Sequence, residues 1–417
     1  MLSKEPLNES WHSRLEEHLR KGRYSPYTTR CRIAAASRFV GYLNKRHVAL
    51  EAVEPLDIDH YLREELRLYR QRHRRAPGSM DHWQHRQTAG IYMLLRLVRK
   101  QWPLSVVGTP SEQFHRQVRE EYAEWMTDIR GLALETRSRR CTEAQQFLSW
   151  LAERGDQQNL LNITIRDVDS YLMVRAALRR RTSVKLYSTN LQSFLLFLYI
   201  SGRMILDLSS VVIGPRLYAF ESIPSALRSD EVSKALETTR KDRSQKGLRD
   251  YAILILLSSY GLRAGEVTAL RLSDVDWQRD VLRIQHLKNG GPSELPLLST
   301  VGNAILDYLQ KGRPKTDARE IFIRHRAPYR PYPNGSSLYR LVRNRITAAG
   351  IEPQGRLGSH AFRHARAVSM LRAAVPIKEI GDLLGHRSSH ATGAYLKLAT
   401  EDLRVVALEI PAEMVEP

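Results

Sequence analysis

An imperfect internal repeat in the first half of the chain is the feature that most constrains its fold. The segment FVGYL at 39–43 is matched by FLSWL at 147–151, and LDIDHYL at 56–62 is matched by RDVDSYL at 166–172. In both copies apolar residues recur at the three- and four-residue spacing of an amphipathic helix. A repeat of this kind indicates that one small helical unit occurs twice.

The repeat predicts two helical domains in tandem. Its acidic and aromatic positions correspond in order: Asp57, Asp59 and Tyr61 in the first copy, and Asp167, Asp169 and Tyr171 in the second. Each copy continues through a basic run into a further apolar helix. We expect four or five helices in each domain, the first domain over 1–108 and the second over 109–212. One large helical domain with chance similarity is the alternative.

The second half of the chain has a mixed pattern. The stretch 213–226 contains two prolines and a glycine and is predicted to be a linker. A helix is expected to start after it with Ser229 as its cap, and residues 248–262 are typical of a buried helix. At 280–298 two short strand-like runs flank an Asn-Gly pair, which is a strong hairpin signal. The predicted fold class is therefore mainly α with a small β-sheet in the C-terminal half.

The charge balance points to a polyanionic partner. The chain has 65 Lys and Arg residues against 45 Asp and Glu residues, a formal net charge of +20. Cations placed on phosphates release condensed counterions, so nucleic acid is the expected partner. A membrane surface is less favoured, because no basic amphipathic helix with a lipid-facing stripe stands out.

No feature of the sequence predicts export or membrane insertion. The first ten residues lack the apolar run of a secretory signal, and the longest apolar stretch, 251–262, is too short to span a bilayer. Two cysteines, Cys31 and Cys141, cannot form a disulfide framework, which suits a reducing compartment. We expect a cytoplasmic, nucleoid-associated protein.

Four segments of the second half carry groups suited to phosphodiester chemistry. Arginines can fork onto the non-bridging oxygens of a phosphate, and histidines can donate hydrogen bonds to these oxygens or move protons. A lysine can protonate a leaving oxygen, and a tyrosine hydroxyl can capture the phosphate covalently. In chain order the segments hold Arg263 with Glu266 three residues on, Lys288 in the hairpin turn, His360 and Arg363 in HAFRH, and His386 and Tyr395 in LGHRSSHATGAYLK.

The same histidines offer little to a metal ion. His360 and His364 are four residues apart, but position 361 is Ala where a zinc protease motif would place Glu. His386 and His390 have the same spacing without an acidic or cysteine partner nearby. We therefore expect neither a metal nor a cofactor. Taken alone, Tyr395 is typical of a packing residue, and the order and spacing of the whole set are what favour chemistry.

In that order and spacing the chain resembles the tyrosine recombinases of the phage integrase family, which are related in chemistry to type IB topoisomerases. The family pattern is Arg, then Lys on a β-hairpin, then His-x-x-Arg, then His, with Tyr nine residues later. The resemblance implies catalytic roles for Arg263, Lys288, His360, Arg363, His386 and the nucleophile Tyr395, with Glu266 in support. It also implies a recombinase catalytic fold over 227–400, preceded by tandem SAM-like helical DNA-binding domains.

Three features depart from the family pattern. Lys288 is the only Lys or Arg between Arg283 and Lys311, whereas the family hairpin commonly has more basic residues on the returning strand. Phe362 stands where Leu is frequent, which we interpret as a neutral exchange within the core. The additional N-terminal domain over 1–108 is absent from shorter members, and it does not have the β-rich pattern of the usual added arm-binding domain.

The resemblance implies a complete reaction. Tyr395 would attack a scissile phosphate to give a 3′-phosphotyrosyl link, and exchange between two double-stranded DNA sites would proceed through a Holliday junction. A homo-oligomer, four protomers on two duplexes, is the family's usual assembly, and the apolar tail 401–417 is expected to dock on a neighbouring protomer. The extra domain favours an integrase or transposase of a mobile element. The alternatives are a Xer-like resolvase, a topoisomerase-like nicking and resealing enzyme, and a non-catalytic DNA-binding accessory protein.

Overall fold

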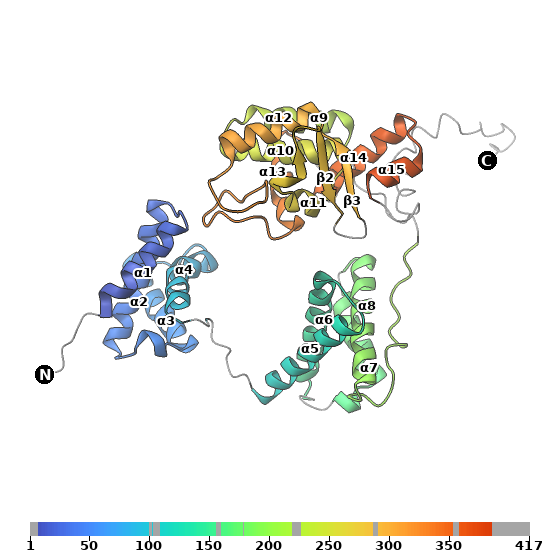
Figure 1. Ribbon diagram of the computed structural model, residues 1–417. Coiled ribbons are helices and arrows are strands. Elements are labelled where there is room, and N and C mark those ends of the chain that lie inside the picture. The colour runs from blue at the N-terminus through green and yellow to red at the C-terminus, as the bar shows by residue number, and fades with distance from the viewer. Residues whose placement is uncertain are drawn as a thin grey trace, which may run out of the picture. The chain divides into compact units, whose positions relative to one another are not determined.

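The fold was obtained as a computed structural model and is mainly helical, with one small sheet among the described residues (Figure 1). These residues are 7–99, 102, 109–155, 160–177, 179–218, 227–286, 291–352 and 358–385. The predicted fold class is thereby confirmed. Contacts group the residues into two units, 35–221 and a second unit of 222–417 with 1–34. The domain boundaries expected from the sequence stay a prediction.

The two copies of the repeat have the same order of elements. The first copy consists of α1 (Leu7–Lys21), α2 (Pro26–Lys45), a short η1 (Leu50–Ala52), α3 (Pro55–His73) and α4 (Met80–Val98). The second consists of α5 (Pro110–Asp128), α6 (Leu134–Glu153), a short η2 (Leu160–Asn162), α7 (Ile165–Ala176) and α8 (Arg181–Ile200).

A triad of aromatic side chains is repeated with its geometry. In the first copy Phe39 and Tyr61 pack edge to face with ring centroids 5.2 Å apart, and Tyr42 lies 5.3 Å from Tyr61. The corresponding distances in the second copy, among Phe147, Trp150 and Tyr171, are 5.0 and 5.6 Å. An arginine also stacks on the second aromatic residue of the triad in each copy, Arg46 on Tyr42 and Arg154 on Trp150. Matching packing at matched positions supports the interpretation of a repeat.

The start of the third helix of each copy is also repeated. Asp57 accepts a hydrogen bond from the backbone N–H of Glu54 at 2.8 Å, and Asp167 accepts one from Thr164 at 3.0 Å. Each pair forms a capping box, which satisfies backbone donors that the first helical turn leaves open. The aspartates matched in the sequence therefore begin equivalent helices.

The second half is built around the apolar helix α10 (Gln245–Tyr260), which is buried as predicted. Around it lie α9 (Ser229–Lys241), α11 (Ala264–Ala269), α12 (Ser299–Asp307) continued by a π-turn at Tyr308–Gly312, α13 (Leu338–Ala348) and α14 (Ser359–Arg372) (Figure 1). The last described helix, α15 (Ile377–Leu383), packs against α14. The expected cap of α9 is wrong. Arg228 is the capping residue, and its backbone N–H donates to Glu231 at 2.8 Å, while Ser229 is the first helical residue.

The predicted hairpin is confirmed as an antiparallel pair, β2 (Val281–Gln285) and β3 (Pro292–Pro296). A two-residue strand, β1 (Val275–Asp276), which the sequence did not predict, pairs with β2 to give the order β1-β2-β3. Residues 287–290 between β2 and β3, including Lys288, lie outside the described part of the chain.

The end of α10 depends on a glycine. Gly261 has a φ of +66° and its N–H bonds to Leu257 at 3.1 Å, which is a left-handed helix terminus. A Cβ added there would approach the Leu384 side chain to 2.7 Å. Gly261 therefore lets the chain turn sharply beneath Leu384, two residues before Arg263.

No helix in the described part of the chain has the length and apolar character needed to cross a bilayer.

Replacement of Phe147 by Ala should destabilise the second repeat copy by about 3–5 kcal/mol, because it removes a fully buried ring from the aromatic cluster. The opening free energy of amides in 134–200, measured by hydrogen exchange, reports this loss. The matched control is Met173→Ala, at a side chain that is 74% exposed. This substitution should change the opening free energy by no more than about 0.5 kcal/mol. An effect of Phe147→Ala equal to that of the control would contradict the packing described above.

Candidate active site

Arg263 is held by the first turn of α11. Its backbone N–H donates to Glu266 Oε2 at 2.7 Å, and its Nη1 donates to Glu266 Oε1 at 2.9 Å. Glu266 lies three residues on, so the helix itself brings the carboxylate beneath the arginine. The Glu266 side chain is 1% exposed and that of Arg263 is 23% exposed. The backbone and one guanidinium nitrogen of Arg263 are thus fixed by Glu266, while part of its side chain is exposed to solvent.

Glu266 is ionised in spite of its burial. Burial acts to raise the pKa of the carboxyl, but hydrogen bonds from His286 and from the backbone and side chain of Arg263 outweigh it and lower the pKa below 4.5. A buried carboxylate with such partners fixes a guanidinium more firmly than an exposed ion pair can. The expected supporting role of Glu266 therefore has a physical basis.

Arg363 reaches the same region from α14. Its side chain is buried, Nη1 donates to the carbonyl of Gly261 at 2.8 Å, and Nη2 donates to the carbonyl of Leu384. Arg263 Nη2 donates to the next carbonyl, that of Gly385, at 3.1 Å. Two arginines that are 100 positions apart in the sequence thus contact consecutive carbonyls immediately before His386.

His360 lies one turn before Arg363 on α14 and is exposed at the surface, with its ring 6.1 Å from that of His364. Phe362 between them is completely buried in the core, which agrees with its interpretation as a packing residue. The arrangement gives α14 two faces at this point, an aromatic face in the core and a polar face.

Of the residues that the sequence singled out, the structure describes Arg263, Glu266, His360 and Arg363. Lys288, His386, Tyr395 and the tail 401–417 lie outside the described residues. The segments that lead to them are described, because β2 ends at Gln285 and the last described residue is Gly385.

The comparisons with known proteins agree with this geometry. Residues 225–402 match the model of the Phage integrase family. A "Putative integrase/recombinase y4rA" of Sinorhizobium fredii is 30% identical over 395 residues, which is 94% of this chain and 91% of that protein. This chain belongs to the phage integrase family of tyrosine recombinases. Tyrosine recombinases are site-specific DNA recombinases, so the chain is a DNA breaking and rejoining enzyme by family.

Further relatives cover parts of this tyrosine recombinase. A "Putative integrase/recombinase y4gC" of the same species is 52% identical over 189 residues, 45% of this chain and 97% of that protein. Among solved structures, XerH recombinase bound to palindromic difH substrate aligns with a TM-score of 0.56 at 15% identity over 73% of this chain and 98% of that one. A lambda integrase dimer bound to a COC′ core site gives 0.52 at 16% over 74% and 87%. Both likenesses concern the fold.

His286 is a component of the site that the sequence did not indicate. It directly follows β2, is 6% exposed, and its Nδ1 lies 2.9 Å from Glu266 Oε1. The only available signal was its place two residues before Lys288, and a histidine near a strand end is uninformative without its partners. Within the described residues no group of three or more His, Cys, Asp and Glu side chains could hold a metal ion.

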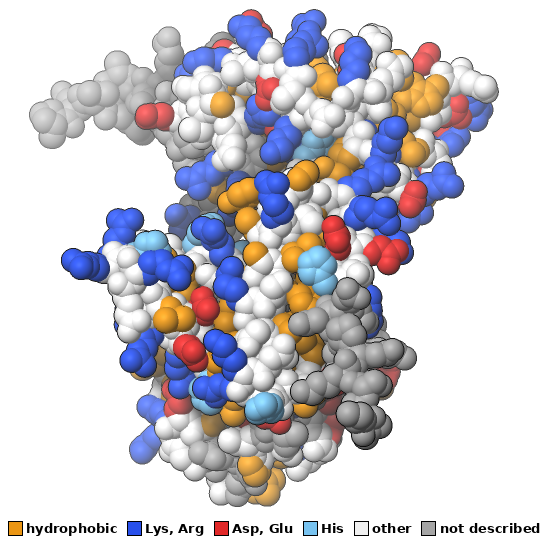
Figure 2. All heavy atoms as spheres, turned by 90° about the vertical axis from the view of Figure 1, so that its left-hand side faces the viewer, with side chains coloured by type: hydrophobic (Ala, Val, Ile, Leu, Met, Phe, Trp, Pro, Cys, Tyr) orange, Lys and Arg blue, Asp and Glu red, His pale blue; other side chains and the backbone are white. Residues whose placement is uncertain are grey.

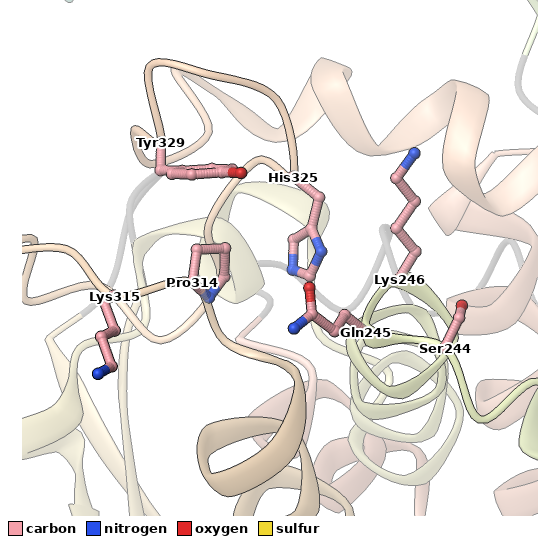
Figure 3. Close-up of a pocket in the computed structure, with 7 residues that line it drawn as sticks. All are labelled: Ser244, Gln245, Lys246, Pro314, Lys315, His325 and Tyr329. Carbon is pink, nitrogen blue, oxygen red and sulfur yellow. The ribbon is translucent and has the colours of Figure 1, made fainter. Parts of the chain in front are cut away.

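A cavity of about 480 Å³ lies away from this cluster, at the first residues of α10 (Figure 3). The helix has 16 residues, so about 24 Å separates the cavity from Gly261 at its other end. Lys246 and Lys315 line the cavity, but their ammonium groups point away from each other (Figure 3). Burial, with Arg249 and Lys246 nearby, lowers the pKa of His325 to about 4, so the ring is neutral at pH 7. The cavity therefore lacks the converging charges that a scissile phosphate requires.

Replacement of Glu266 by Gln should lower the free energy of unfolding of the catalytic unit by about 3 kcal/mol at pH 7, since Arg263 and His286 lose an ionised buried partner. The Glu266 pKa is lowered in the folded protein, so this stabilisation is present above pH 4.5 and is lost as the pH falls through the folded pKa. The difference between wild type and variant should therefore shrink towards acid.

Urea unfolding at pH 7 and at pH 4 measures that difference. The control is Glu294→Gln, at a side chain that is 59% exposed and pairs with Arg283 on the surface. It should cost no more than about 1 kcal/mol at either pH. A Glu266→Gln difference that grows towards acid would contradict the direction of the pKa shift.

Proposed function

We propose that this tyrosine recombinase cleaves and rejoins DNA at specific sites through a 3′-phosphotyrosyl intermediate, with Tyr395 as the nucleophile. The observation that carries the proposal is the meeting of Arg263 and Arg363 at the carbonyls of Leu384 and Gly385. This places two guanidinium groups at the start of the segment that holds His386 and Tyr395. Two positioned cations suit a pentacoordinate phosphorane, whose charge they stabilise more than that of the ground state.

Each proposed catalytic group has a separate role. Tyr395 Oη attacks the scissile phosphorus, the bond to the 5′ oxygen breaks, and Lys288 gives that oxygen a proton. His360 and His386 donate hydrogen bonds to the non-bridging oxygens, beside Arg263 and Arg363. The phosphodiester energy is retained in the tyrosyl link, so a 5′ hydroxyl of a partner strand can reverse the reaction without ATP.

The exposed face of α13 is the proposed DNA contact in the catalytic unit. Arg340 and Arg343 lie on this face, whereas Arg345 is turned inward and pairs with Asp242 and Asp250, each at 2.8 Å. Within the basic run 330–345, phosphate contacts are therefore proposed only for the arginines that face outward. Basic side chains far outnumber acidic ones on the face drawn in Figure 2.

The assembly follows from the same proposal. The helical domains over 1–108 and 109–212 and the catalytic domain over 227–400 would bind one recombination site, with 213–226 as the linker. The related lambda integrase has been crystallised as a tetramer bound to a Holliday junction. We propose that four protomers act on two duplexes here too, and that the tail 401–417 docks on a neighbour.

The proposed biological role is that of an integrase or transposase of a mobile element, in the cytoplasm and at the nucleoid. It is supported by the long relative named as an integrase/recombinase and by the additional repeat copy, which suits a longer or bipartite site. Resolution of replicon dimers, topoisomerase-like nicking and resealing, and DNA binding without catalysis are the competing roles. Recombinant products from two target sites would exclude topoisomerase-like nicking and resealing and DNA binding without catalysis. Resolution of replicon dimers also exchanges strands and would give such products too.

Wild type should form a covalent complex with DNA, and Tyr395→Phe should form none, because phenylalanine has no nucleophilic oxygen. Sheared, nicked DNA from the source genome is incubated with each protein, the protein is denatured, and covalently attached fragments are sequenced, which also identifies the site. Tyr251→Phe, at a half-buried tyrosine of α10, is the matched control and should retain attachment. Attachment by Tyr395→Phe would assign the nucleophile elsewhere.

Arg343→Ala should weaken binding to duplex DNA at all sequences and reduce the slope of log K against log salt by about 1, since one phosphate contact is lost. Lys241→Ala on α9, whose ammonium pairs with Glu237, serves as the control and should leave the slope unchanged. Fluorescence anisotropy over a salt series measures both. An unchanged slope for Arg343→Ala would remove α13 from the DNA contact.

A further inference from the structure

The imidazole of His286 joins three separate segments of the catalytic unit. Nδ1 lies 2.9 Å from Oε1 of Glu266 on α11, and Nε2 lies 3.0 Å from Oγ of Ser293 on β3. The face of the imidazole lies against Gly385, where an added Cβ would come within 2.9 Å of Cε1 and Nδ1. With an exposed fraction of 6%, the ring is enclosed by these partners.

The chemistry of the partners fixes the direction of these hydrogen bonds. Glu266 is ionised and can only accept, so Nδ1 must carry a proton and donate to it. In the neutral ring Nε2 then accepts from the Ser293 hydroxyl, which is free to rotate. Both ring nitrogens are satisfied in one orientation of the imidazole.

Gly385 makes the fit possible. Its φ of +61° is in the left-handed region that favours glycine, and any side chain would collide with the imidazole. The same Gly385 accepts from Arg263 through its carbonyl. The imidazole and the guanidinium therefore lie against one residue, and that residue immediately precedes His386.

We infer that His286 is a positioning residue that fixes the base of the β2–β3 turn against Glu266 and thereby sets where Lys288 acts. The inference rests on the proposed function, because it concerns the proton that Lys288 gives to the leaving oxygen. Lys288 follows His286 by two residues, and two residues of extended chain span at most about 7 Å. The anchor at His286 is thus separated from Lys288 by a single residue of the sequence.

The position of Ser293 strengthens the anchor. Ser293 pairs with Ile284 in the β2–β3 register, so its hydroxyl lies across the ladder from the end of β2. The described backbone pairing of β2 and β3 ends at Gln285 and Pro292. The hydrogen bond between Ser293 and His286 Nε2 adds a side-chain link between the two strands at this end. Two contacts of one imidazole, one to α11 and one to β3, therefore hold His286 at the end of β2.

The test compares two DNA duplexes that carry the site identified by covalent capture. In one the scissile phosphate has its normal 5′ oxygen, and in the other this bridging oxygen is sulfur. A thiolate can leave without protonation, because a thiol has a pKa near 8.5. A hydroxyl leaving group is far more basic, as the pKa of about 15.7 for water illustrates, and it requires a proton. Cleavage of the sulfur substrate therefore does not depend on Lys288, whereas it still depends on the arginines that hold the phosphate.

His286→Phe keeps the size of the ring and removes both nitrogens. We expect it to cleave the oxygen substrate about 100-fold more slowly than wild type, the lower end of what a general acid contributes, and to cleave the sulfur substrate at close to the wild-type rate. Lys288→Ala should show the same selective rescue, and Arg263→Ala should be slow on both substrates. Ser293→Ala, which removes one contact only, should show a smaller loss that sulfur also restores.

Equal losses of His286→Phe on both substrates, or no loss on either, would overturn the inference. Thermal unfolding shows whether His286→Phe is folded, and Ser293→Ala decides the matter if it is not, because the serine lies at the partly exposed edge of the sheet. Failure of the proposed function has a different signature, namely no covalent complex of the wild type with either substrate.

Discussion

The buried carboxylate of Glu266 is the interaction on which the catalytic region depends. It accepts hydrogen bonds from the backbone and side chain of Arg263 and from His286, so one ionised group holds the start of α11 and the end of β2 together. A charge of this kind is tolerated in a protein interior only when it is fully paired, and removal of one partner leaves the others uncompensated. The geometry of the site is therefore strongly coupled to this one residue.

The arginines extend that organisation to distant parts of the chain. Arg263 continues from Glu266 to the carbonyl of Gly385, and Arg363 joins the carbonyls of Gly261 and Leu384. Gly261 and Gly385, both with positive φ, allow the backbone to approach at these points. Two guanidinium groups held in this way are organised before a phosphate arrives, which is the condition for stabilising charge in a transition state without further reorganisation.

Much of this could be predicted from the sequence, because the features concerned are local. Helical spacing and the Asn-Gly turn were enough to predict the mainly helical fold, the burial of α10 and the β2–β3 hairpin. The pairing of Arg263 with Glu266 follows from their separation by one helical turn. The roles of His286 and Ser293 could not be predicted, because they arise from contacts between α11, β2 and β3. The inward orientation of Arg345 and the extra strand β1 also depend on contacts with distant residues. The helix α9 is capped at Arg228 and not at Ser229, because the backbone N–H of Arg228 donates to the Glu231 carboxylate.

The identity of the residue that carries DNA after cleavage tests the role of Tyr395 most directly. The covalent complex of wild-type protein is digested with nuclease and protease, and the peptide that retains a nucleotide is sequenced by mass spectrometry. We expect a nucleotide joined through its 3′ phosphate to Tyr395. A nucleotide on any other residue, or one joined through a 5′ phosphate, would contradict it.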